Sequence, residues 1–392
     1  MLNKGALMEN FIWKIPTEIY FGKNQISNLK KMKDYGKKTL IIHSSSAEKY
    51  GILKEAEDIL KDNGISYLTF TGIRANPRIE EVREAITIAK ENNVDMILAV
   101  GGGSVLDTSK IVAAGFYYEK DSWDIVIDSS LVKRTLPLFT VITLAATGSE
   151  MNDTAVISND SIPMKKGSHS SYYYPVLSVL DPTYTFSVNA FQSACGAADI
   201  FAHTVESYFN HSDAFLQKRL AESIMETVVK YGPAVLDNPE DYTARSNLLW
   251  AGDLAINGLV KYGCPIVWQA HGLGHQLSAY YGVTHGLSLA LIIPAWLEYI
   301  LSEDTKEDIA VLGERVFKLN YNSDRYKQAE NTINSLKDFF YKDLRLPSSL
   351  KEIGITDTSY FKEMARESEA RTLQGYVPLN KEDNEKIYFM IL

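Results

Sequence analysis

The sequence predicts an α/β domain with a parallel sheet over residues 1–188, followed by an all-helical domain over residues 189–392. Three observations support this fold class. The chain has 392 residues, which is more than a single hydrophobic core usually serves, so two domains are expected. Short apolar runs alternate with amphipathic runs as far as Asp181. Beyond Asp181 the alternation stops, and long amphipathic runs continue to Leu392.

In the first domain, each apolar run is bounded by turn residues or by an amphipathic run. The apolar runs predict strands within residues 38–46, 65–72, 94–100, 136–144 and 174–181. The amphipathic runs predict helices in residues 51–64 and 78–93, and a third helix that begins near Val105. Because the strands are rich in Val, Ile and Leu and alternate with helices, we expect a parallel sheet covered on both faces.

In the second domain, the pattern is helical throughout. The segments "SACGAADIFAHTVESYF" (193–209) and "AFLQKRLAESIMETVVKYG" (214–232) have the apolar spacing of helices that pack against a core. No internal repeat, low-complexity tract or flexible Gly/Ser linker interrupts them. The change of pattern after Asp181 is therefore the best domain boundary.

The composition excludes several classes of protein. A content of 45% hydrophobic and 23% charged residues is typical of a soluble globular protein. The net charge of -9 disfavours nucleic acid as a partner. No run of about 18 apolar residues predicts a membrane span, and no signal peptide is recognised at the start. With only Cys195 and Cys264 as cysteines, we expect a protein of the reducing cytoplasm.

A glycine-rich turn follows the predicted strand at 94–100, in the stretch "AVGGGSVLDTSK" (99–110). Gly101, Gly102, Gly103 and Ser104 would let backbone N–H groups approach an anion, and the helix that follows adds partial positive charge. Phosphate is the natural occupant of such a turn. The spacing is not G-x-G-x-x-G, so a purely structural turn is the alternative. Asp107 could bond a ribose or substrate hydroxyl, or only compensate the helix dipole.

Five further residues have the chemistry of metal ligands. Asp199 and His203 are spaced i, i+4, which places both side chains on one helical face about 6 Å apart along the axis. His271, His275 and His285 lie within the single stretch "HGLGHQLSAYYGVTH". Two of these imidazoles together with Asp199 and His203 would suit a divalent transition metal. The alternative for any one of them is a core or interface histidine, and we interpret His211 as a surface residue.

Taken together, the motifs resemble the iron-dependent (group III) alcohol dehydrogenase family, in its branch of butanol dehydrogenases and NADPH-dependent aldehyde reductases. The resemblance covers nearly the whole chain. It rests on the order and spacing of "PTEIYFGKNQI", "ANPRIEEVREAI", "LAVGGGSVLDTSK", "LAATGSEMNDTAVIS", "LDPTYTF", "AADIFAHTVESYF" and "HGLGHQLSAYYGVTHGLSLAL". It implies a Rossmann-like parallel sheet followed by helices, the architecture also found in dehydroquinate synthase-like proteins.

The resemblance also implies roles for individual residues. The metal ligands would be Asp199, His203, His271 and His285, while His275 would line the site and act as a catalytic residue in proton transfer. The metal would be one divalent ion, iron or zinc. The coenzyme would contact Gly101, Gly102, Gly103, Ser104, Asp107, Thr143, Thr147 and Lys165. Lys166 follows Lys165 directly, so this last assignment has an open register of one residue.

The choice of coenzyme depends on the turn after the first strand. An acid there would bond the adenosine ribose and repel a 2′-phosphate. This chain has "HSSS", in which Ser44, Ser45 and Ser46 offer hydroxyl groups, and no acid occurs before Glu48. We therefore expect NADP(H) to be preferred over NAD(H). Relatives in the NADPH-dependent branch usually have glycines at His43 to Ser45, which is a departure in this sequence.

These features predict a metal-dependent alcohol dehydrogenase or aldehyde reductase. A hydride would pass between NADP(H) and short- to medium-chain aldehydes or primary alcohols such as butanal and butanol, with the metal polarising the carbonyl. We also expect a homodimer. Two alternatives stay open at this point. One is a polyol oxidoreductase similar to glycerol dehydrogenases, and the other is a binding protein that keeps the fold without catalysis.

Overall fold

The computed structural model describes residues 6–392, which form two compact units. Unit 1 contains the described residues up to Trp13 together with Asn189–Asn238 and Leu254–Leu392, and unit 2 contains Lys14–Val188 and Pro239–Asp253. The predicted boundary after residue 188 is one of the points at which the chain passes from one unit to the other. The assignment of residues 1–188 to the coenzyme and 189–392 to the metal stays a prediction.

A six-stranded sheet forms the centre of unit 2, with its strands in the order β1, β8, β5, β4, β2, β3. The bounds of these strands are Glu18–Phe21 (β1), Lys38–His43 (β2), Ser66–Phe70 (β3), Met96–Gly101 (β4), Leu138–Ile142 (β5) and Leu177–Leu180 (β8). All neighbouring strands pair in parallel, as predicted. Their carboxyl ends therefore meet at one edge, which is where ligands bind in open parallel sheets.

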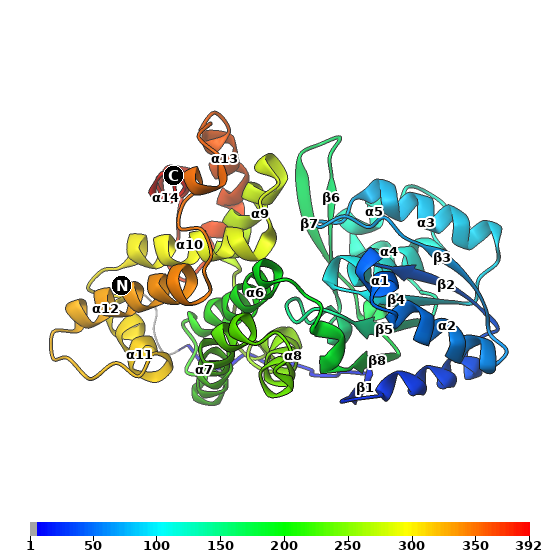
Figure 1. Ribbon diagram of the computed structural model, residues 1–392. Helices are drawn as coiled ribbons and strands as arrows, with labels where there is room; N and C mark the ends of the chain where they lie inside the picture. Colours follow the sequence, from blue (N-terminus) through cyan, green and yellow to red (C-terminus); the bar gives the residue numbers. More distant parts are fainter. Residues whose placement is uncertain (1–5) are drawn as a thin grey trace. The chain divides into compact units, whose positions relative to one another are not determined.

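Alternate side chains of each central strand enter two different cores. In β2, Leu40 and Ile42 join the core on one face, while Ile41 joins the core on the other. The first core is covered by α3 (Ile79–Glu91), α4 (Gly103–Gly115) and α5 (Ser122–Ile127). The second core is covered by the 3-10 helix η1 (Gln25–Asp34), α1 (Ser45–Lys49) and α2 (Ile52–Asp62). Figure 1 shows α3 and α5 on one side of the strands and α2 on the other.

Some elements of unit 2 differ from the prediction. The sequence did not predict β1, α1, α5 or the antiparallel pair of β6 (Thr154–Asn159) and β7 (Met164–His169). Helix α4 begins at Gly103 and not near Val105, because Gly102 already has the extended backbone of an N-cap. The glycines of the turn are thus partly inside the first helical turn.

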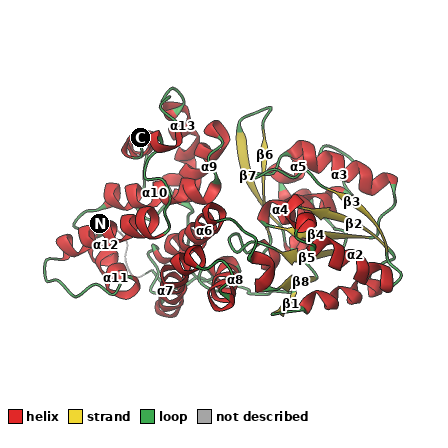
Figure 2. Cartoon of the chain, viewed as in Figure 1, coloured by secondary structure: helices red, strands yellow, loops and turns green. Residues whose placement is uncertain are grey.

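Unit 1 is helical, and Figure 2 shows that the strands of the described chain all belong to unit 2. The two predicted helices are confirmed as α6 (Ala190–Tyr208) and α7 (Phe215–Asp237). The others are α9 (Gln269–Tyr281), α10 (His285–Ile300), α11 (Lys306–Val316), α12 (Arg325–Asp338), α13 (Phe361–Thr372) and α14 (Lys381–Met390). Helix α6 is buried along nearly its whole length and packs against α7, α9 and α10. The predicted fold class is confirmed.

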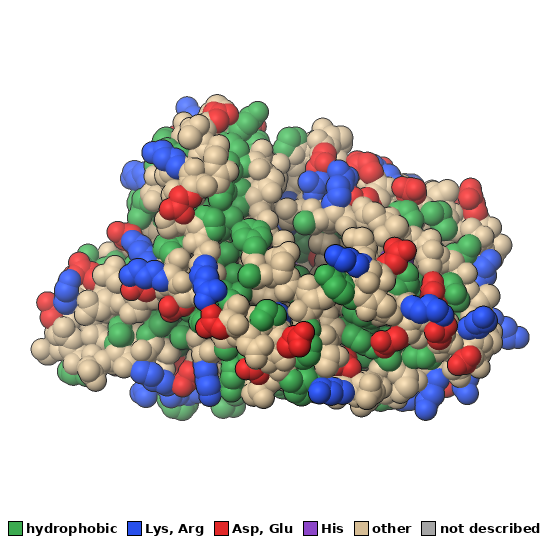
Figure 3. Space-filling model, in the orientation of Figure 1, with side chains coloured by type: hydrophobic (Ala, Val, Ile, Leu, Met, Phe, Trp, Pro, Cys, Tyr) green, Lys and Arg blue, Asp and Glu red, His purple; other side chains and the backbone are tan. Residues whose placement is uncertain are grey.

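The remaining elements are short, apart from α8 (Tyr242–Ile256), which begins in unit 2 and ends in unit 1. The 3-10 helices are η2 (Ser129–Leu131), η3 (Ser149–Met151), η4 (Ser171–Tyr173), η5 (Pro182–Thr185) and η7 (Lys351–Ile353), and η6 (Phe339–Asp343) is a π-helical turn. On the face drawn in Figure 3, basic and acidic side chains are interspersed. Within residues 6–392, no helix combines the length and the apolarity needed to cross a membrane.

Candidate metal centre and nucleotide-binding turn

Helix α6 presents Asp199 and His203 from one buried face. Asn189 caps the helix by accepting a hydrogen bond from the backbone N–H of Gln192. This cap fixes where α6 begins, and so which of its residues face the site. Asp199 and His203 are 3% and 4% exposed. Asp199 Oδ1 lies 3.5 Å from His203 Nε2, as the i, i+4 spacing predicts. Both side chains are therefore held in one place by a rigid, buried helix.

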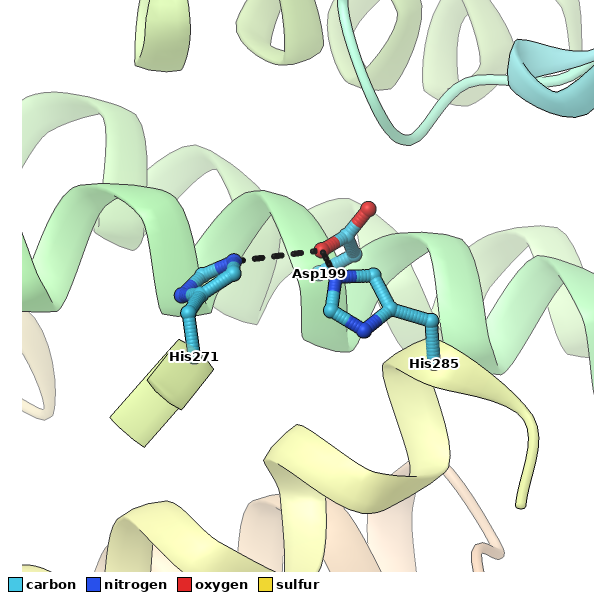
Figure 4. A group of neighbouring side chains, drawn as sticks. All are labelled: Asp199, His271 and His285. Carbon is cyan, nitrogen blue, oxygen red and sulfur yellow. Dashed lines mark ion pairs between the residues drawn. The ribbon is translucent and has the colours of Figure 1, made fainter. Parts of the chain in front are cut away.

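His271 and His285 approach the same carboxylate from two other helices. His271 lies in the first turn of α9 and His285 is the first residue of α10, and their Nε2 atoms are 3.9 Å and 3.6 Å from Asp199 Oδ1. Figure 4 shows both imidazoles directed at this oxygen. Gly286 makes the approach possible, because a Cβ atom there would collide with the carbonyl group of Cys195 on α6.

These distances fit a shared cation better than direct hydrogen bonds. Hydrogen bonds between such atoms are usually about 2.9 Å long, whereas ligand atoms about 2.1 Å from one tetrahedral ion are about 3.4 Å apart. Among the described residues, Asp199 Oδ1 accepts no hydrogen bond although it is buried. Ligand atoms of Asp199, His271 and His285 lie within 4.8 Å of one another. One carboxylate oxygen and several imidazole nitrogens suit a divalent transition metal.

His203 belongs to this cluster through its contact with Asp199 and through its ring, which stacks on that of His271 with centroids 4.9 Å apart. Burial lowers the pKa of His203 to about 4. The imidazole is therefore neutral at physiological pH, which is the protonation state that a metal ligand requires. That these four residues bind the metal stays a prediction.

His275 lies one turn after His271 on α9 and is also buried. Its ring centroid is 5.2 Å from that of His285 and 6.1 Å from that of His271. Among the described residues, the group of converging ligand atoms consists of Asp199, His271 and His285. His275 does not belong to it, and neither does His203, which differs from His275 in its contact with Asp199 Oδ1. The structure thus puts His275 beside the cluster, and its catalytic role in proton transfer stays a prediction.

Glu206 is a residue of this site that the sequence analysis missed. It follows His203 by three residues on the same face of α6 and accepts hydrogen bonds from the backbone N–H groups of Ala270 and His271 and from His271 Nδ1. Burial raises its pKa to about 8, against the effect of those two N–H groups and of the positive charge of Arg371. The signal in the sequence was the spacing of Asp199, His203 and Glu206, which gives one face of a helix three polar residues in a row.

In unit 2, the glycine turn connects β4 to α4, and its three glycines have different surroundings. A Cβ atom on Gly101 would collide with Val105, and one on Gly103 would collide with Thr147. A Cβ atom on Gly102 would only contact Leu144 at 3.4 Å, which is an ordinary distance. Close packing therefore explains why glycine is needed at Gly101 and Gly103. Gly102 has space around it, and this space is where a ligand could approach the backbone.

The other residues predicted to contact the coenzyme have contacts of their own within the chain, and they are Asp107, Thr143, Thr147 and Lys165. Asp107 accepts hydrogen bonds from Ser149 Oγ (2.7 Å) and from the backbone N–H of Val156 (3.0 Å), so both of its oxygens have partners in the chain. Burial raises its pKa. Thr143 donates its backbone N–H to Gly101, and Thr147 Oγ1 accepts from Ser149. Lys165 Nζ, on β7, donates to Asn76 Oδ1 at 2.8 Å. Asp107 is thus engaged within the chain, and its predicted contact with a coenzyme stays a prediction.

The serines after β2 lie beside the glycine turn. His43 pairs with Val100 at the end of β4, and the backbone N–H of Ser44 donates to Val100. Ser44 caps α1, because its Oγ accepts from the backbone N–H of Ala47 and lies 2.9 Å from Ser46 Oγ. Ser45 and Ser46 form the first turn of α1. The glycine turn and the serine turn thus lie at the same edge of the sheet in unit 2. That these two turns contact a coenzyme stays a prediction.

Comparison with known proteins gives one consistent result. Two family models match, "Iron-containing alcohol dehydrogenase" over residues 16–182 and the C-terminal part of the same family over residues 193–392. A relative from Clostridium acetobutylicum, NADH-dependent butanol dehydrogenase A, is 42% identical and covers 97% of this chain and 99% of its own. The NADPH-dependent aldehyde reductase YqhD of Escherichia coli is 39% identical over 90% of this chain and 91% of its own.

Solved structures agree with these relatives. A crystal structure of NADH-dependent butanol dehydrogenase A from Thermotoga maritima superposes with a TM-score of 0.92 at 32% identity and covers 98% of this chain and 99% of the other. The structure of E. coli YqhD also gives a TM-score of 0.92, at 34% identity, and covers 99% of this chain and 100% of the other.

Proposed function

This chain belongs to the iron-containing alcohol dehydrogenase family, as its motifs predicted, and on that premise we propose which residues perform its reaction and with which coenzyme. The chain is an oxidoreductase that interconverts alcohols and aldehydes, in a family that uses a nicotinamide coenzyme and a metal. We propose that Asp199, His203, His271 and His285 hold one divalent ion, iron or zinc. The observation that carries this proposal is the convergence of three Nε2 atoms on Asp199 Oδ1, at 3.5 to 3.9 Å.

The overall reaction consumes an aldehyde, a reduced coenzyme and a proton, and yields an alcohol and the oxidised coenzyme. A bound divalent ion would supply Lewis-acid polarisation of the substrate oxygen, and the coenzyme would supply the hydride. The chain's own residues have the remaining tasks. Asp199 contributes the only negative charge of the four proposed ligands, while burial keeps His203 neutral. His275, beside the cluster but outside the converging group, is the residue we propose for delivering the proton to the product oxygen.

For the coenzyme, we propose a preference for NADP(H). The support is the row of hydroxyl groups from Ser44 to Ser46 and the absence of an acid before Glu48, which leaves room and donors for a 2′-phosphate. The relatives differ on this point, since the clostridial enzyme is named for NADH and the E. coli enzyme for NADPH. For the substrate, we propose short- to medium-chain aldehydes and primary alcohols, in keeping with the butanol dehydrogenase names of the relatives.

The metal assignment is tested by three variants measured for metal content and for aldehyde reduction. His285→Ala should lose metal and most turnover, because it removes one ligand. His275→Ala should keep its metal and lose rate, since proton transfer contributes to the reaction without holding the ion. His211→Ala is the matched control, because His211 lies in the same unit and bonds the carbonyl of Tyr376. Full metal content in His285→Ala would show that the ligand set is wrong.

We further propose that the protein is a cytoplasmic homodimer. Support for self-association comes from large apolar side chains that are exposed in unit 1, with Leu7, Ile12 and Phe215 at 87%, 89% and 75% exposure. Sedimentation velocity at micromolar concentration measures the mass directly. A monomer at every concentration would contradict the dimer and leave the proposed chemistry unaffected.

A further inference from the structure

Helix α9 begins without a cap from its own sequence. The helix starts at Gln269, and the preceding Trp268 makes no side-chain hydrogen bond to its first turn among the described residues. The first N–H groups of any helix lack partners within the helix, and leaving them buried and unpaired is costly. Here the carboxylate of Glu206, on α6, accepts from the N–H of Ala270 at 2.6 Å and from the N–H of His271 at 3.1 Å. Glu206 therefore caps α9 from a different helix.

The same carboxylate also bonds the side chain of His271. Glu206 Oε2 accepts from the backbone N–H of His271 and is in hydrogen-bond contact with its Nδ1 atom. Glu206 is only 2% exposed, so water does not compete for these bonds. The backbone and the ring of His271 are thus held by one group. The opposite ring nitrogen, Nε2, faces Asp199 Oδ1 at 3.9 Å.

Helix α13 closes this arrangement from the other side. The positive charge of Arg371 acts on Glu206, and the Arg371 side chain lies so close to Gly272 that a Cβ atom there would be 2.9 Å from Arg371 Cδ. Gln269 Nε2 donates to the carbonyl groups of Thr372 and Val377 at 2.9 and 2.8 Å. The first turn of α9 is therefore fixed by α6 on one side and by the end of α13 on the other.

We propose that Glu206 is a positioning residue for the metal: by accepting the Nδ1 proton of His271, it selects the tautomer whose Nε2 lone pair is directed at the site. This inference rests on the proposed function, because it assumes that His271 is a ligand. A histidine ligand usually donates its other ring N–H to a carboxylate or carbonyl group, which orients the ring and strengthens the ligand. The structure assigns Glu206 to that task and also makes it the cap of the helix that carries His271.

A role limited to capping α9 would have different consequences. Glu206→Gln keeps the shape and leaves one oxygen that can accept from a backbone N–H, so much of the cap survives. Its amide nitrogen, however, can only donate. Facing Nδ1, it would favour the tautomer with the proton on Nε2, which has no Nε2 lone pair to direct at the site. The glutamine variant therefore separates positioning from capping.

The experiment measures Co²⁺ affinity of the metal-free full-length protein, by visible absorption in competition with a chelator. Wild type, Glu206→Gln, His285→Ala and the control Glu222→Gln are compared. Glu222 is a second buried acid of unit 1, 6% exposed on α7 and paired with Arg219. We expect Glu206→Gln to weaken Co²⁺ binding by about 10- to 100-fold. Glu222→Gln should bind as wild type does. Wild-type affinity in Glu206→Gln would overturn the inference.

A second measurement is made on the wild-type protein and does not require that Glu206→Gln folds. In the metal-free protein, ¹⁵N NMR of the histidine rings reports which nitrogen of His271 is protonated. The signals of His271 are identified as those that are missing from the spectrum of His271→Ala. A proton on Nδ1 supports the inference, and a proton on Nε2 overturns it even if Glu206→Gln does not fold. Failure of the proposed metal site would look different, since wild type would then bind no Co²⁺ or His285→Ala would bind it equally well.

Discussion

Ser44 combines two properties that are separable by substitution. Its hydroxyl caps α1, and its position at the end of β2 puts it beside the glycine turn. Asp and Asn are caps as good as Ser, so either can replace it without loss of the helix start. Only Asp adds a negative charge where a 2′-phosphate would lie.

Ser44→Asp should shift the coenzyme preference from NADPH towards NADH. The new charge repels a phosphate and offers an acceptor to the unmodified ribose hydroxyl, and because the turn is exposed to solvent we expect about 1–3 kcal/mol in relative specificity. The measurement is the ratio of kcat/KM for the two coenzymes at fixed salt. Ser44→Asn is the control and should leave the ratio within about 1 kcal/mol of wild type. A wild-type enzyme that already favours NADH would contradict the proposed preference.

Among single residues, the sequence predicted those whose spacing alone is informative. Asp199 and His203 are four residues apart, so they lie on the same face of the helix wherever that helix packs, and their proximity followed from the sequence. Glu206 did not stand out, because a glutamate in an amphipathic helix is usually solvent-exposed and its burial here depends on α9. The hydrogen-bond partners of Asp107 were equally hidden, since Ser149 and Val156 lie more than forty residues away in the chain.

At the scale of elements, the turn between β4 and α4 contains glycines of two kinds, and this gives a matched pair of variants. Gly102→Val should weaken coenzyme binding more than tenfold, because the branched side chain occupies the space through which a phosphate would reach the backbone. Gly103→Ala should instead lower the unfolding free energy by about 1–3 kcal/mol, through its collision with Thr147. Coenzyme fluorescence titration and urea unfolding measure the two effects. Unchanged coenzyme binding in Gly102→Val would indicate a purely structural turn.

A second element-scale feature is a pair of buried acids, Glu150 in η3 and Asp253 in α8. Glu150 and Asp253 are 2% and 0% exposed, and Glu150 Oε2 and both Asp253 oxygens accept no hydrogen bond from the described residues. Burial raises the pKa of Glu150 to about 7, and burial together with the charge of Glu150 raises the pKa of Asp253 well above its usual value.

The sign of the pH dependence follows from these raised pKa values. The unfolded chain ionises both acids above about pH 4, whereas in the folded chain Glu150 keeps its proton until about pH 7 and the pKa of Asp253 is also raised, so stability falls as the pH rises above about 4. Asp253→Asn should therefore be more stable than wild type at pH 8, on the order of 1–3 kcal/mol, with the difference shrinking towards pH 4. Urea unfolding across this range measures it. Glu84→Gln, on the exposed side of α3, is the control. A constant difference at all pH values would contradict the assignment.

The elements that the sequence predicted are those with strong apolar patterns. Strands β2, β4 and β5 are buried on both faces, and their apolar runs identify them. Strand β1 has four residues and lies at the edge of the sheet, which is too short for a clear pattern. Strand β7, with the sequence MKKGSH, is polar, and it is a strand only because it pairs with β6. Pairing with a distant partner is not visible in a local pattern.

At the scale of the whole molecule, the two units should respond differently to metal removal. The proposed ligands all lie in unit 1, on α6, α9 and α10. A ligand present at 100 times its dissociation constant stabilises the folded state by about 2.7 kcal/mol. Chelation should therefore speed amide hydrogen exchange in α6, α9 and α10 and leave exchange in β2, β4 and β5 unchanged. Uniform acceleration throughout the chain would contradict a metal confined to unit 1.

The division of the chain into units was only partly predictable. The change of pattern after Asp181 reflects the real end of the alternating strands and helices. Residues 239–253 contain most of helix α8, and nothing local in their sequence shows that they belong to unit 2. Their place depends on long-range contacts, such as that of the Trp250 ring with Phe21 at 5.9 Å between centroids.

Because residues 239–253 belong to unit 2, the α/β unit is still incomplete when residue 188 leaves the ribosome during synthesis. Domains of larger proteins usually fold as they leave the ribosome, the N-terminal one first. Here α6, α7 and the first part of α8 must be synthesised before the Trp250 ring can contact Phe21 and Leu249 can join the core of unit 2. A chain paused between residues 189 and 238 lacks the contacts that Leu249 and Trp250 make in unit 2, so we expect the apolar surface beneath them to stay uncovered for as long as the pause lasts.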